Sequence, residues 1–592
     1  MFRQHVSRLG LIGLGLVLPS GVFAQAAAPA GHPAPATQDW TPLSRPRTHA
    51  AQPTTTPITE ADLKTRLYLF SDDSMGGRLV ASPGNVKGVE YIAGELKKLG
   101  IEPAGENGTY FQTVGVFNRV FDPATPVSVD GNSFTVWTDF IPRDQGPGAR
   151  PVDGMPVIYG GTWGDSTSLI SPDLAAGKFV VFSLVPAGYS APDAPGTANR
   201  GMITRRYIQA AGIAVVGLDD IPAANRGVFQ QTFPSIHFES PNQVPTFLYV
   251  TRDMGAKLMG APLAGLSAGT TGRTVHGAPR FIEQPVQYPA RNVVGRIRGS
   301  DPALAGEYVA IGAHNDHIGT GTPVAHDSMY VVNHLFRTSG ADDPPVELTA
   351  EQAHQVNDIL AGIRRQTNGA SARVDSIFNG ADDDGSGSMG LLEIAQYFAG
   401  QRTHTKRSLL FIWHVGEEEG LWGSAHFTDE PTVPRDSIVA ELNIDMIGRG
   451  APSDVTGQKK EGGVIYGNPD YVQVIGSRRL STELGDLAVA VDKTERNPLS
   501  FDYALDANGH PQNIYCRSDH YMYARYGIPI AFFTTGGHAD YHQVTDEPQY
   551  IDYNRLMRVS SFIADLAVRV ANLDHRIVVD QPKPDPKGQC QQ

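Results

Sequence analysis

The chain has 592 residues, of which 41% are hydrophobic and 19% charged, a composition typical of a globular protein with a large buried core. Its 48 Lys and Arg against 62 Asp and Glu give a net charge of −14. This composition excludes wholesale disorder and a disulfide-dense scaffold, and the acidic balance argues against binding to nucleic acid through phosphate contacts. The length suggests about four domain equivalents at roughly 150 residues each.

Residues 1–24 have the features of a secretory signal peptide. Arg3 and Arg8 form a positive start, residues 9–18 are apolar apart from glycine, and Val22 to Ala24 fits a small-x-small cleavage site. We expect an exported protein, periplasmic or secreted, with no membrane span after signal removal, because no later stretch approaches about 18 uninterrupted apolar residues. An uncleaved membrane anchor is the alternative.

The next segment, 25–57, is rich in Ala, Pro and Thr, which predicts a disordered leader. Order is expected to begin with Thr59 as the N-cap of a helix, and a second helix should end at Gly100. These helices open the first part of the main domain, predicted over 58–145.

Residues 146–275 are predicted to form a separate β-rich module. Short strands are expected at Lys178–Phe182, Ile213–Gly217 and Val244–Val250, with a helix through Tyr207–Ala211. The module contains no cluster of candidate catalytic residues. Its pattern resembles the protease-associated domain that is inserted in several exopeptidases.

Strands alternate with helices in the second part of the main domain, 276–575. Helices are predicted near 386–400, 470–485 and 554–572. Strands are predicted at Asn292–Ile297, Tyr308–Ala313, Leu409–Val415, Ile438–Ile444 and Pro529–Phe533. The alternation indicates an α/β fold in which helices sandwich a mixed, largely parallel sheet, and ligands of such folds gather at the carboxyl ends of the strands.

An insertion at 320–378 interrupts this alternation. It contains one predicted helix, which begins at the capping box Thr349–Gln352. Because the insertion leaves and re-enters the chain between two candidate ligand segments, it forms either a rim or lid of the site or a remote surface excursion.

The chain closes with a tail at 576–592. The whole chain has two cysteines, Cys516 and Cys590, and this number excludes a Cys-based metal cluster. The two residues are either unpaired thiols or a single staple of the tail.

Five segments at predicted strand ends or in loops hold acids and histidines. They are Ala313–Asp316, Asn379–Gly387, Gly416–Ser424, Asn443–Asp445 and Asp540–His542. Singly, a strand-end aspartate is more often a cap and a glutamate run is more often a solvated face. Together they supply two histidines and three carboxylates, which suit two Zn²⁺ ions, or Co²⁺ or Mn²⁺, that share a bridging aspartate. A spare glutamate beside them completes a hydrolytic centre.

These motifs, in this order, resemble metallopeptidase family twenty-eight, the co-catalytic di-zinc aminopeptidases and their glutamate-carboxypeptidase relatives. The resemblance covers roughly 58–120 and 280–575. The motifs that carry it are His314-x-Asp316, Gly380–Gly387, Gly416–Ser424, Asn443-Ile-Asp445, Ser518-Asp519-His520 and Tyr541-His542.

The resemblance implies a set of metal ligands. One zinc would take His314, Asp383 and Asp445, and the other would take Asp383, Glu418 and His542. Either neighbour of Asp383 in the run of three aspartates is the alternative bridging ligand.

The resemblance also implies two catalytic roles, and the pairing of a carboxylate with a candidate ligand histidine assigns a role to Asp316. Glu417 would act as the general base, and Tyr541 would donate a hydrogen bond to the tetrahedral intermediate. Asp316 would orient the ring of His314.

Several other polar residues near these motifs are expected to have structural roles. Glu419, Asp382 and Asp384 should face solvent or hold their loops, and His520 should pack. His317 should only shape the site, and Asp546 should contact a metal ligand without binding the metal itself.

The predicted function is therefore an exported di-zinc exopeptidase that acts on a peptide substrate, an aminopeptidase that releases N-terminal residues. The alternative within the same chemistry is a glutamate-releasing carboxypeptidase. Its candidate carboxylate binders are Arg200, Arg205 and Arg206 in the inserted module and Arg449, Arg496 and Arg517 near the core. A non-catalytic binding ectodomain on the same fold is the alternative of a different class. The sequence predicts neither the oligomeric state nor the preferred side chain.

Overall fold

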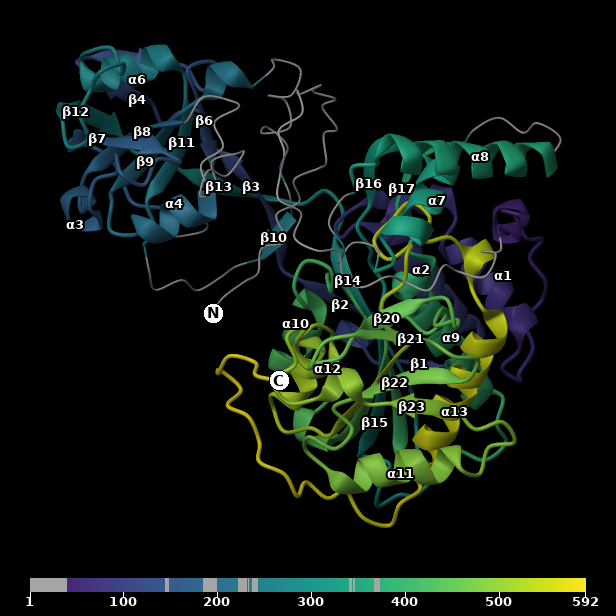
Figure 1. Cartoon of the computed structure of the whole chain (residues 1–592). Helices are drawn as coiled ribbons and strands as arrows, with labels where there is room; N and C mark the ends of the chain where they lie inside the picture. The colour runs from purple at the N-terminus through teal and green to yellow at the C-terminus, as the bar shows by residue number, and fades with distance from the viewer. Residues whose placement is uncertain are drawn as a thin grey trace. The chain divides into compact units, whose positions relative to one another are not determined.

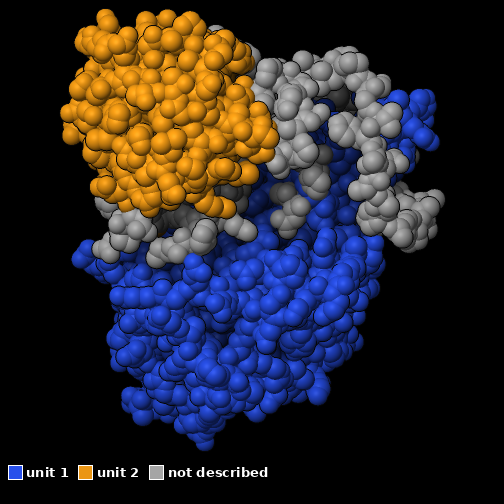
Figure 2. All heavy atoms as spheres, turned by 60° about the vertical axis from the view of Figure 1, so that its left-hand side comes forward, with its two compact units in different colours: residues 1–114, 287–592 blue, residues 115–286 orange. Residues whose placement is uncertain are grey.

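The structure is a computed structural model, and it describes residues 40–143, 149–184, 200–221, 232, 234–236, 243–339, 343, 346–366 and 373–592. The predicted signal peptide lies outside these residues. The chain divides into two compact units, shown in different colours in Figure 2. Unit 1 comprises residues 1–114 and 287–592, and unit 2 comprises residues 115–286.

Unit 1 is built on a nine-stranded sheet with the order β1-β14-β18-β15-β19-β24-β22-β23, and β2 also pairs with β14. Figure 1 labels β1, β2, β14, β15, β22 and β23 of this sheet. Strands β18, β15, β19 and β24 run parallel to one another, whereas β14 and β22 are antiparallel to their neighbours β18 and β24. The strands are β1 (Glu102–Pro103), β2 (Phe111–Val114), β14 (Ala290–Ile297), β15 (Tyr308–His314), β18 (Ser408–His414), β19 (Ile438–Ile444), β22 (Tyr471–Ile475), β23 (Ser500–Asp502) and β24 (Ile530–Thr534).

The central strands are apolar on both faces because helices cover both sides of the sheet. In β15, Val309 and Ile311 pack into one core and Ala310 packs into the other. Such continuous apolar runs are typical of a parallel sheet covered on both faces. One core includes residues of α1 (Glu60–Phe70), α2 (Pro83–Lys98), α9 (Gly387–Ala399), α11 (Thr482–Asp492) and α13 (Tyr553–Ala571). The other includes residues of α10 (Trp422–Asp429) and α12 (His520–Ala524). The predicted fold class is confirmed.

One predicted helix in this unit is wrong in its first half. The helix expected near 470–485 is strand β22 followed by α11. Apart from Gln473, the residues of β22 are β-branched or aromatic, and all of them are buried in a strand that pairs with β24, which favours a strand. The helix begins only after Ser481, whose side chain accepts a hydrogen bond from the Leu484 N–H at 3.1 Å.

The Thr59 N-cap is confirmed, but residues 40–57 do not fit the disordered leader predicted over 25–57. The Thr59 side chain accepts a hydrogen bond from the Asp62 N–H at 3.1 Å. Arg45 donates to the Gln549 carbonyl at 3.1 Å, and Tyr68 donates to the Pro46 carbonyl at 2.8 Å. The segment also contains the short helix η1 (Thr41–Ser44). Its composition favours an extended backbone, and partners that are distant in sequence hold that backbone against unit 1.

The described residues of the insertion form a pair of antiparallel strands and two helices, where one helix was predicted. Strands β16 (Thr320–Ala325) and β17 (Val374–Ile377) pair antiparallel and enclose α7 (His326–Phe336) and α8 (Ala350–Gln366). The predicted capping box at the start of α8 is confirmed, since the Thr349 N–H donates to Gln352 Oε1 at 2.8 Å and the Gln352 N–H donates back to Thr349 Oγ1 at 3.2 Å.

Unit 2 has an eight-stranded sheet, β5-β4-β12-β7-β8-β9-β11-β6, and a three-stranded sheet, β10-β3-β13. It is wider than the module predicted over 146–275, because strands before residue 146 and after residue 275 pair within its sheets. Its larger strands are β7 (Met155–Trp163), β8 (Phe179–Leu184), β9 (Gly212–Val216), β11 (Thr246–Val250), β12 (Thr271–Gly277), β3 (Val116–Phe121) and β13 (Phe281–Pro285). The shorter strands are β4 (Val127–Val129), β5 (Asn132–Phe134), β6 (Phe140–Arg143) and β10 (Pro234–Ile236).

The described residues of unit 2 include the helices α3 (Pro172–Ala175), α4 (Arg200–Arg206) and α6 (Arg252–Met259). The helix predicted through Tyr207–Ala211 is wrong in position, because α4 ends at Arg206. The Tyr207 ring packs instead on Phe182 of β8, with ring centroids 4.9 Å apart. The resemblance of this unit to a protease-associated domain stays a prediction.

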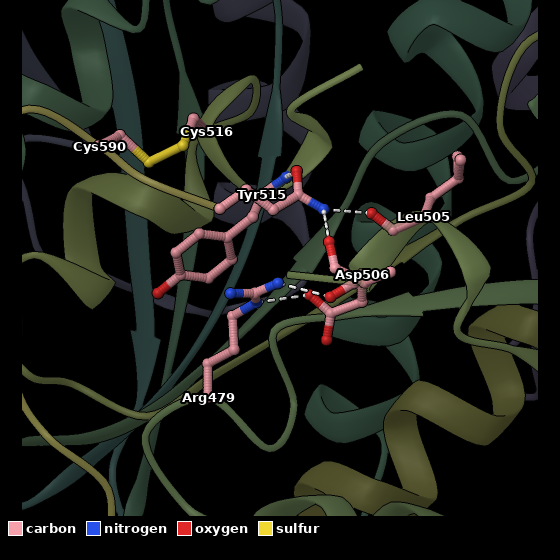
Figure 3. Close-up of a disulfide and its surroundings, with 8 residues drawn as sticks. Arg479, Leu505, Asp506, Tyr515, Cys516 and Cys590 are labelled. Carbon is pink, nitrogen blue, oxygen red and sulfur yellow. Dashed lines mark hydrogen bonds and ion pairs between the residues drawn. A yellow bond between two sulfur atoms is a disulfide. The ribbon is translucent and has the colours of Figure 1, made fainter. Parts of the chain in front are cut away.

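Cys516 and Cys590 form a disulfide across a sequence separation of 74 residues, so the staple is the correct alternative. Figure 3 shows the surroundings of this disulfide. Arg479 pairs with Asp506 at 2.6 Å, and its guanidinium lies 4.5 Å from the centroid of the Tyr515 ring. The tail is thereby fixed to the segment that precedes α12. Among the described residues, no helix has both the length and the apolar character needed to cross a membrane.

Candidate metal centre

The candidate site residues of unit 1 follow the carboxyl ends of the parallel strands. His314 ends β15, Glu417 and Glu418 follow β18, Asp445 follows β19, and His542 lies on the loop after β24. The carboxyl ends of parallel strands lie at one edge of a sheet, which is where ligands of α/β folds gather. Asp383 reaches the same edge from the turn η7 (Ala381–Ser386) at the start of α9.

Asp383 contacts a histidine with each of its two carboxylate oxygens. Oδ1 lies 3.2 Å from His314 Nε2, and Oδ2 lies 2.9 Å from His542 Nε2. His314 Nε2 is also 3.5 Å from Asp445 Oδ1, and His542 Nε2 is also 3.1 Å from Glu418 Oε2. The structure therefore brings the five predicted ligands into two groups that share Asp383.

The carboxylates of these groups change the proton affinity of both histidines. Burial alone would lower the pKa of His542, but the nearby Glu418 and Asp383 outweigh burial and raise it to about 10. Burial is likewise outweighed at His314, where Asp445, Asp316 and Asp383 raise the pKa well above its usual value. A cation at either group would compete with these protons, because metal binding requires the unprotonated ring nitrogen.

The donor set fits metal ions. His314, Asp445 and His542 each have a buried nitrogen or oxygen that makes no hydrogen bond within the described residues. Imidazole and carboxylate donors gathered in this way suit zinc. Leaving such atoms buried and unpaired would otherwise be costly.

The loop that carries Asp383 is fixed by buried groups that the sequence did not single out. Arg78 donates to the carbonyls of Phe70, Asn379 and Gly380 at 3.1, 2.6 and 2.8 Å. Burial lowers the pKa of Arg78 to about 10, although nearby carboxylates partly oppose the effect.

Asp546 holds the same loop from the other side, in agreement with its expected supporting role. Its carboxylate accepts the N–H groups of Asp382 and Asp383 at 3.0 and 3.1 Å.

Asp382 and Asp384, which flank Asp383 in the sequence, are fully buried. Their expected exposure to solvent is therefore wrong, and the alternative, that they hold the loop, is correct. Asp384 Oδ2 accepts the His314 N–H at 3.0 Å, and Oδ1 accepts the N–H groups of Gly387 and Met446 at 2.9 and 3.1 Å. Asp384 also lies within ligand distance of His314 and Asp445. Because both of its oxygens already accept backbone N–H groups, Asp383 is the better bridging candidate.

The carboxylate of Asp316 contacts the backbone at Glu417 rather than the ring of His314. Its Oδ1 accepts the N–H groups of Gly416 and Glu417 at 2.7 and 3.2 Å, whereas it is 3.7 Å from His314 Nδ1, which is too long for a hydrogen bond. Burial raises the pKa of Glu417 well above its usual value; His314 opposes this shift and Asp445 adds to it. Bound cations would favour the ionised carboxylate.

A cavity opens beside these groups. Asp383, Glu417, Glu418 and Asp445 line one part of it. Apolar residues line another part, namely Met446, Val455, Leu505, Ile514 and Phe532. The insertion contributes Ser339 to this lining, so the insertion lies at the rim of the cavity.

Tyr541 also lines the cavity, and its ring stacks on His542 with centroids 4.0 Å apart. Arg517 Nη2 donates to the Tyr541 hydroxyl at 3.4 Å. Among the described residues that line the cavity, Arg517 is the one with positive charge. Arg449 is buried and paired with Asp540 at 2.8 Å, which leaves it poorly placed to bind a substrate carboxylate.

The structure shows which carboxylates two further residues of the site contact. Ser518 donates to Asp445 Oδ2 at 2.8 Å and accepts from Asn443 at 3.0 Å. His317 Nδ1 lies 2.7 Å from Glu418 Oε1. Ser518 belongs to one of the motifs and His317 was expected to shape the site, but the sequence did not indicate these contacts. His520 stacks on Phe532 with ring centroids 4.6 Å apart, in agreement with its expected packing role.

Residues 366–567 match the family model described as peptidase family M28. This match confirms the predicted resemblance to the M28 metallopeptidases, and the matched segment includes Asp383, Glu417, Glu418, Asp445 and His542.

Leucine aminopeptidase 1 of Paracoccidioides brasiliensis (strain Pb18) is 28% identical over 201 residues, which cover 32% of this chain and 46% of that protein. Leucine aminopeptidase 1 of Neurospora crassa is 27% identical over 266 residues, which cover 41% of this chain and 61% of that protein. The chain thus spans about half the length of the curated relatives it matches. A solved zinc aminopeptidase from Bacillus subtilis is similar with a TM-score of 0.44 and 15% identity, over 88% of this chain and 98% of that one.

Proposed function

We propose that the chain is an exported exopeptidase that holds two zinc ions and removes N-terminal residues from peptides. The observation that carries the proposal is the position of Asp383, whose two oxygens each lie beside a histidine–carboxylate group. The match of residues 366–567 to peptidase family M28 supports peptide hydrolysis, and relatives named leucine aminopeptidase favour the N-terminal end.

In this proposal His314, Asp383 and Asp445 hold one zinc, and Asp383, Glu418 and His542 hold the other. Bound zinc supplies Lewis acidity, which lowers the pKa of a water molecule and polarises the scissile carbonyl.

The remaining steps are assigned to side chains of the chain itself. Glu417 accepts a proton from the attacking water and passes it to the leaving amine. Asp316 fixes the backbone of Glu417 through the N–H groups of residues 416 and 417. The hydroxyl of Tyr541 donates a hydrogen bond to the developing oxyanion.

The cavity favours release of an N-terminal residue with an apolar side chain. The part of the cavity that is lined by apolar residues offers no charged partner to a substrate side chain. These residues are Met446, Val455, Leu505, Ile514 and Phe532. The acidic lining would attract a free α-amino group. A carboxypeptidase would need positive charge for a terminal carboxylate. Arg449 is already paired with Asp540, which leaves Arg517 as the cationic residue of the described lining, against the four lining carboxylates Asp383, Glu417, Glu418 and Asp445.

The general base is tested by Glu417→Gln, which keeps the size of the side chain and removes its proton affinity. Hydrolysis should be abolished while zinc content stays at two ions per chain and the unfolding midpoint stays unchanged. Turnover close to that of the wild type would refute this role for Glu417.

The substrate end is tested by parallel digestion of one peptide that is either N-acetylated or C-amidated. An aminopeptidase cleaves the amidated peptide and spares the acetylated one. The opposite pattern would identify the carboxypeptidase alternative, and absence of zinc in protein purified without chelator would favour the binding ectodomain.

A further inference from the structure

His317 is buried beside the second metal group, although it was expected only to shape the site. It is 0% exposed, and its ring lies edge-on to that of His542 with centroids 5.6 Å apart. One ligand-type atom from each of His317, Asp383, Glu418 and His542 lies within 4.8 Å of the others.

The two oxygens of Glu418 face different histidines. Oε2 lies 3.1 Å from His542 Nε2, which in turn lies 2.9 Å from Asp383 Oδ2. Oε1 lies 2.7 Å from His317 Nδ1, a length typical of a hydrogen bond to a carboxylate. His317 Nδ1 is farther from Asp383, at 3.7 Å from Oδ2. His317 thus contacts the oxygen of Glu418 that points away from His542.

The backbone around His317 holds its ring in this place. The His317 N–H donates to the Arg78 carbonyl at 3.3 Å. Gly380, on the loop that carries Asp383, packs so closely on the ring that an added Cβ would lie 2.5 Å from the His317 Cγ. The absence of a side chain at residue 380 therefore makes room for the imidazole between this loop and Glu418.

We propose that His317 is a positioning residue of the second metal group, where it donates a hydrogen bond from Nδ1 to Glu418 Oε1 and so directs Oε2 toward the metal. The inference rests on the proposed function, since it presumes a metal at this group. Without the donor the Glu418 carboxylate is free to rotate about its last bond. Loss of such a partner typically weakens metal binding by about 10- to 100-fold.

The test measures zinc affinity rather than activity. His317→Phe fills the space of the ring without a donor, His317→Ala removes the ring, and His317→Asn keeps an N–H near the position of Nδ1. Zinc binding is followed by competition with a chromophoric chelator, and zinc content is measured by elemental analysis.

The matched control is His326→Asn. His326 is also buried and also contacts a carboxylate, Glu547 Oε2 at 3.0 Å, but it belongs to neither metal group found among the described residues. Its replacement should leave both zinc affinities unchanged. Unfolding midpoints of the zinc-free proteins establish that each variant is folded, and the Phe variant replaces the Ala variant if the latter does not fold.

The proposal predicts that the Phe and Ala variants bind one of the two zinc ions about 10- to 100-fold more weakly, while the Asn variant stays close to the wild type. Unchanged affinity in the Phe and Ala variants would overturn it. Equal loss in the Asn variant would also overturn it, because His317 would then be a ligand itself. A wild type that binds fewer than two zinc ions would instead refute the proposed function.

Discussion

Glu547 ties the insertion to the loop that carries His542, and its removal provides a quantitative test of that connection. The carboxylate is buried and forms ion pairs with His326, at the start of α7, and with Arg373, just before β17. Glu547 therefore contacts both ends of the insertion. We expect Glu547→Gln to destabilise unit 1 even though the two side chains have the same shape.

The size of the effect follows from the pKa of Glu547. Burial alone would raise this pKa, but hydrogen bonds and charge interactions with His326 and Arg373 outweigh burial and lower it from 4.5 to about 2. The difference corresponds to about 3 kcal/mol of folding free energy. Because the pKa of the folded state is lowered, this stability is present above pH 4.5 and is lost as the pH falls from 4.5 toward 2.

The assay is urea unfolding of the zinc-free wild type and of Glu547→Gln at several pH values. At pH 7 the variant should be less stable by about 3 kcal/mol, and the difference should shrink by about 1.4 kcal/mol for each pH unit below the pKa of the unfolded state. A difference below about 1 kcal/mol at pH 7, or one that does not change with pH, would contradict the assigned contacts.

Two further variants and reduction of the disulfide test the site and its supports. Asp384→Asn should lower the free energy of unfolding by about 1–3 kcal/mol for each backbone N–H left without an acceptor, and urea unfolding that matches the wild type would refute this role. Ser518→Ala removes the hydrogen bond to Asp445 and should weaken the binding of one zinc ion by about 10- to 100-fold in chelator competition, with a small effect on the free energy of unfolding. A zinc affinity equal to that of the wild type would argue against this role of Ser518. Reduction of the Cys516–Cys590 disulfide should cost about 2–4 kcal/mol of stability and raise KM, because the segment before α12 lines the cavity, and an unchanged unfolding midpoint would contradict the assignment.

The sequence was a good guide to the fold wherever local pattern and tertiary packing agree. The strands β15, β18 and β19 are fully buried and mostly apolar, and the start of α1 is marked by its N-cap at Thr59. Prediction failed where packing decides. Residues 471–475 form a strand because a neighbouring strand pairs with them, and residues 40–57 are held by partners that no local pattern reveals.

The candidate site was predictable as a set of residues but not as a set of contacts. Strand-end positions of His314 and Asp445 indicated one edge of the sheet, and the structure brings them together with Asp383. The positions of His317 and Ser518 beside specific carboxylates depend on side-chain directions, which sequence spacing does not define. The catalytic roles of Glu417, Tyr541 and Asp316 stay predictions.

The most direct test of the central claim is X-ray diffraction from zinc-loaded crystals at the zinc absorption edge, which locates each bound ion. The account predicts two zinc ions in each chain, with one oxygen of Asp383 at about 2.0–2.2 Å from each ion. A single ion, or two ions that do not share Asp383, would contradict it.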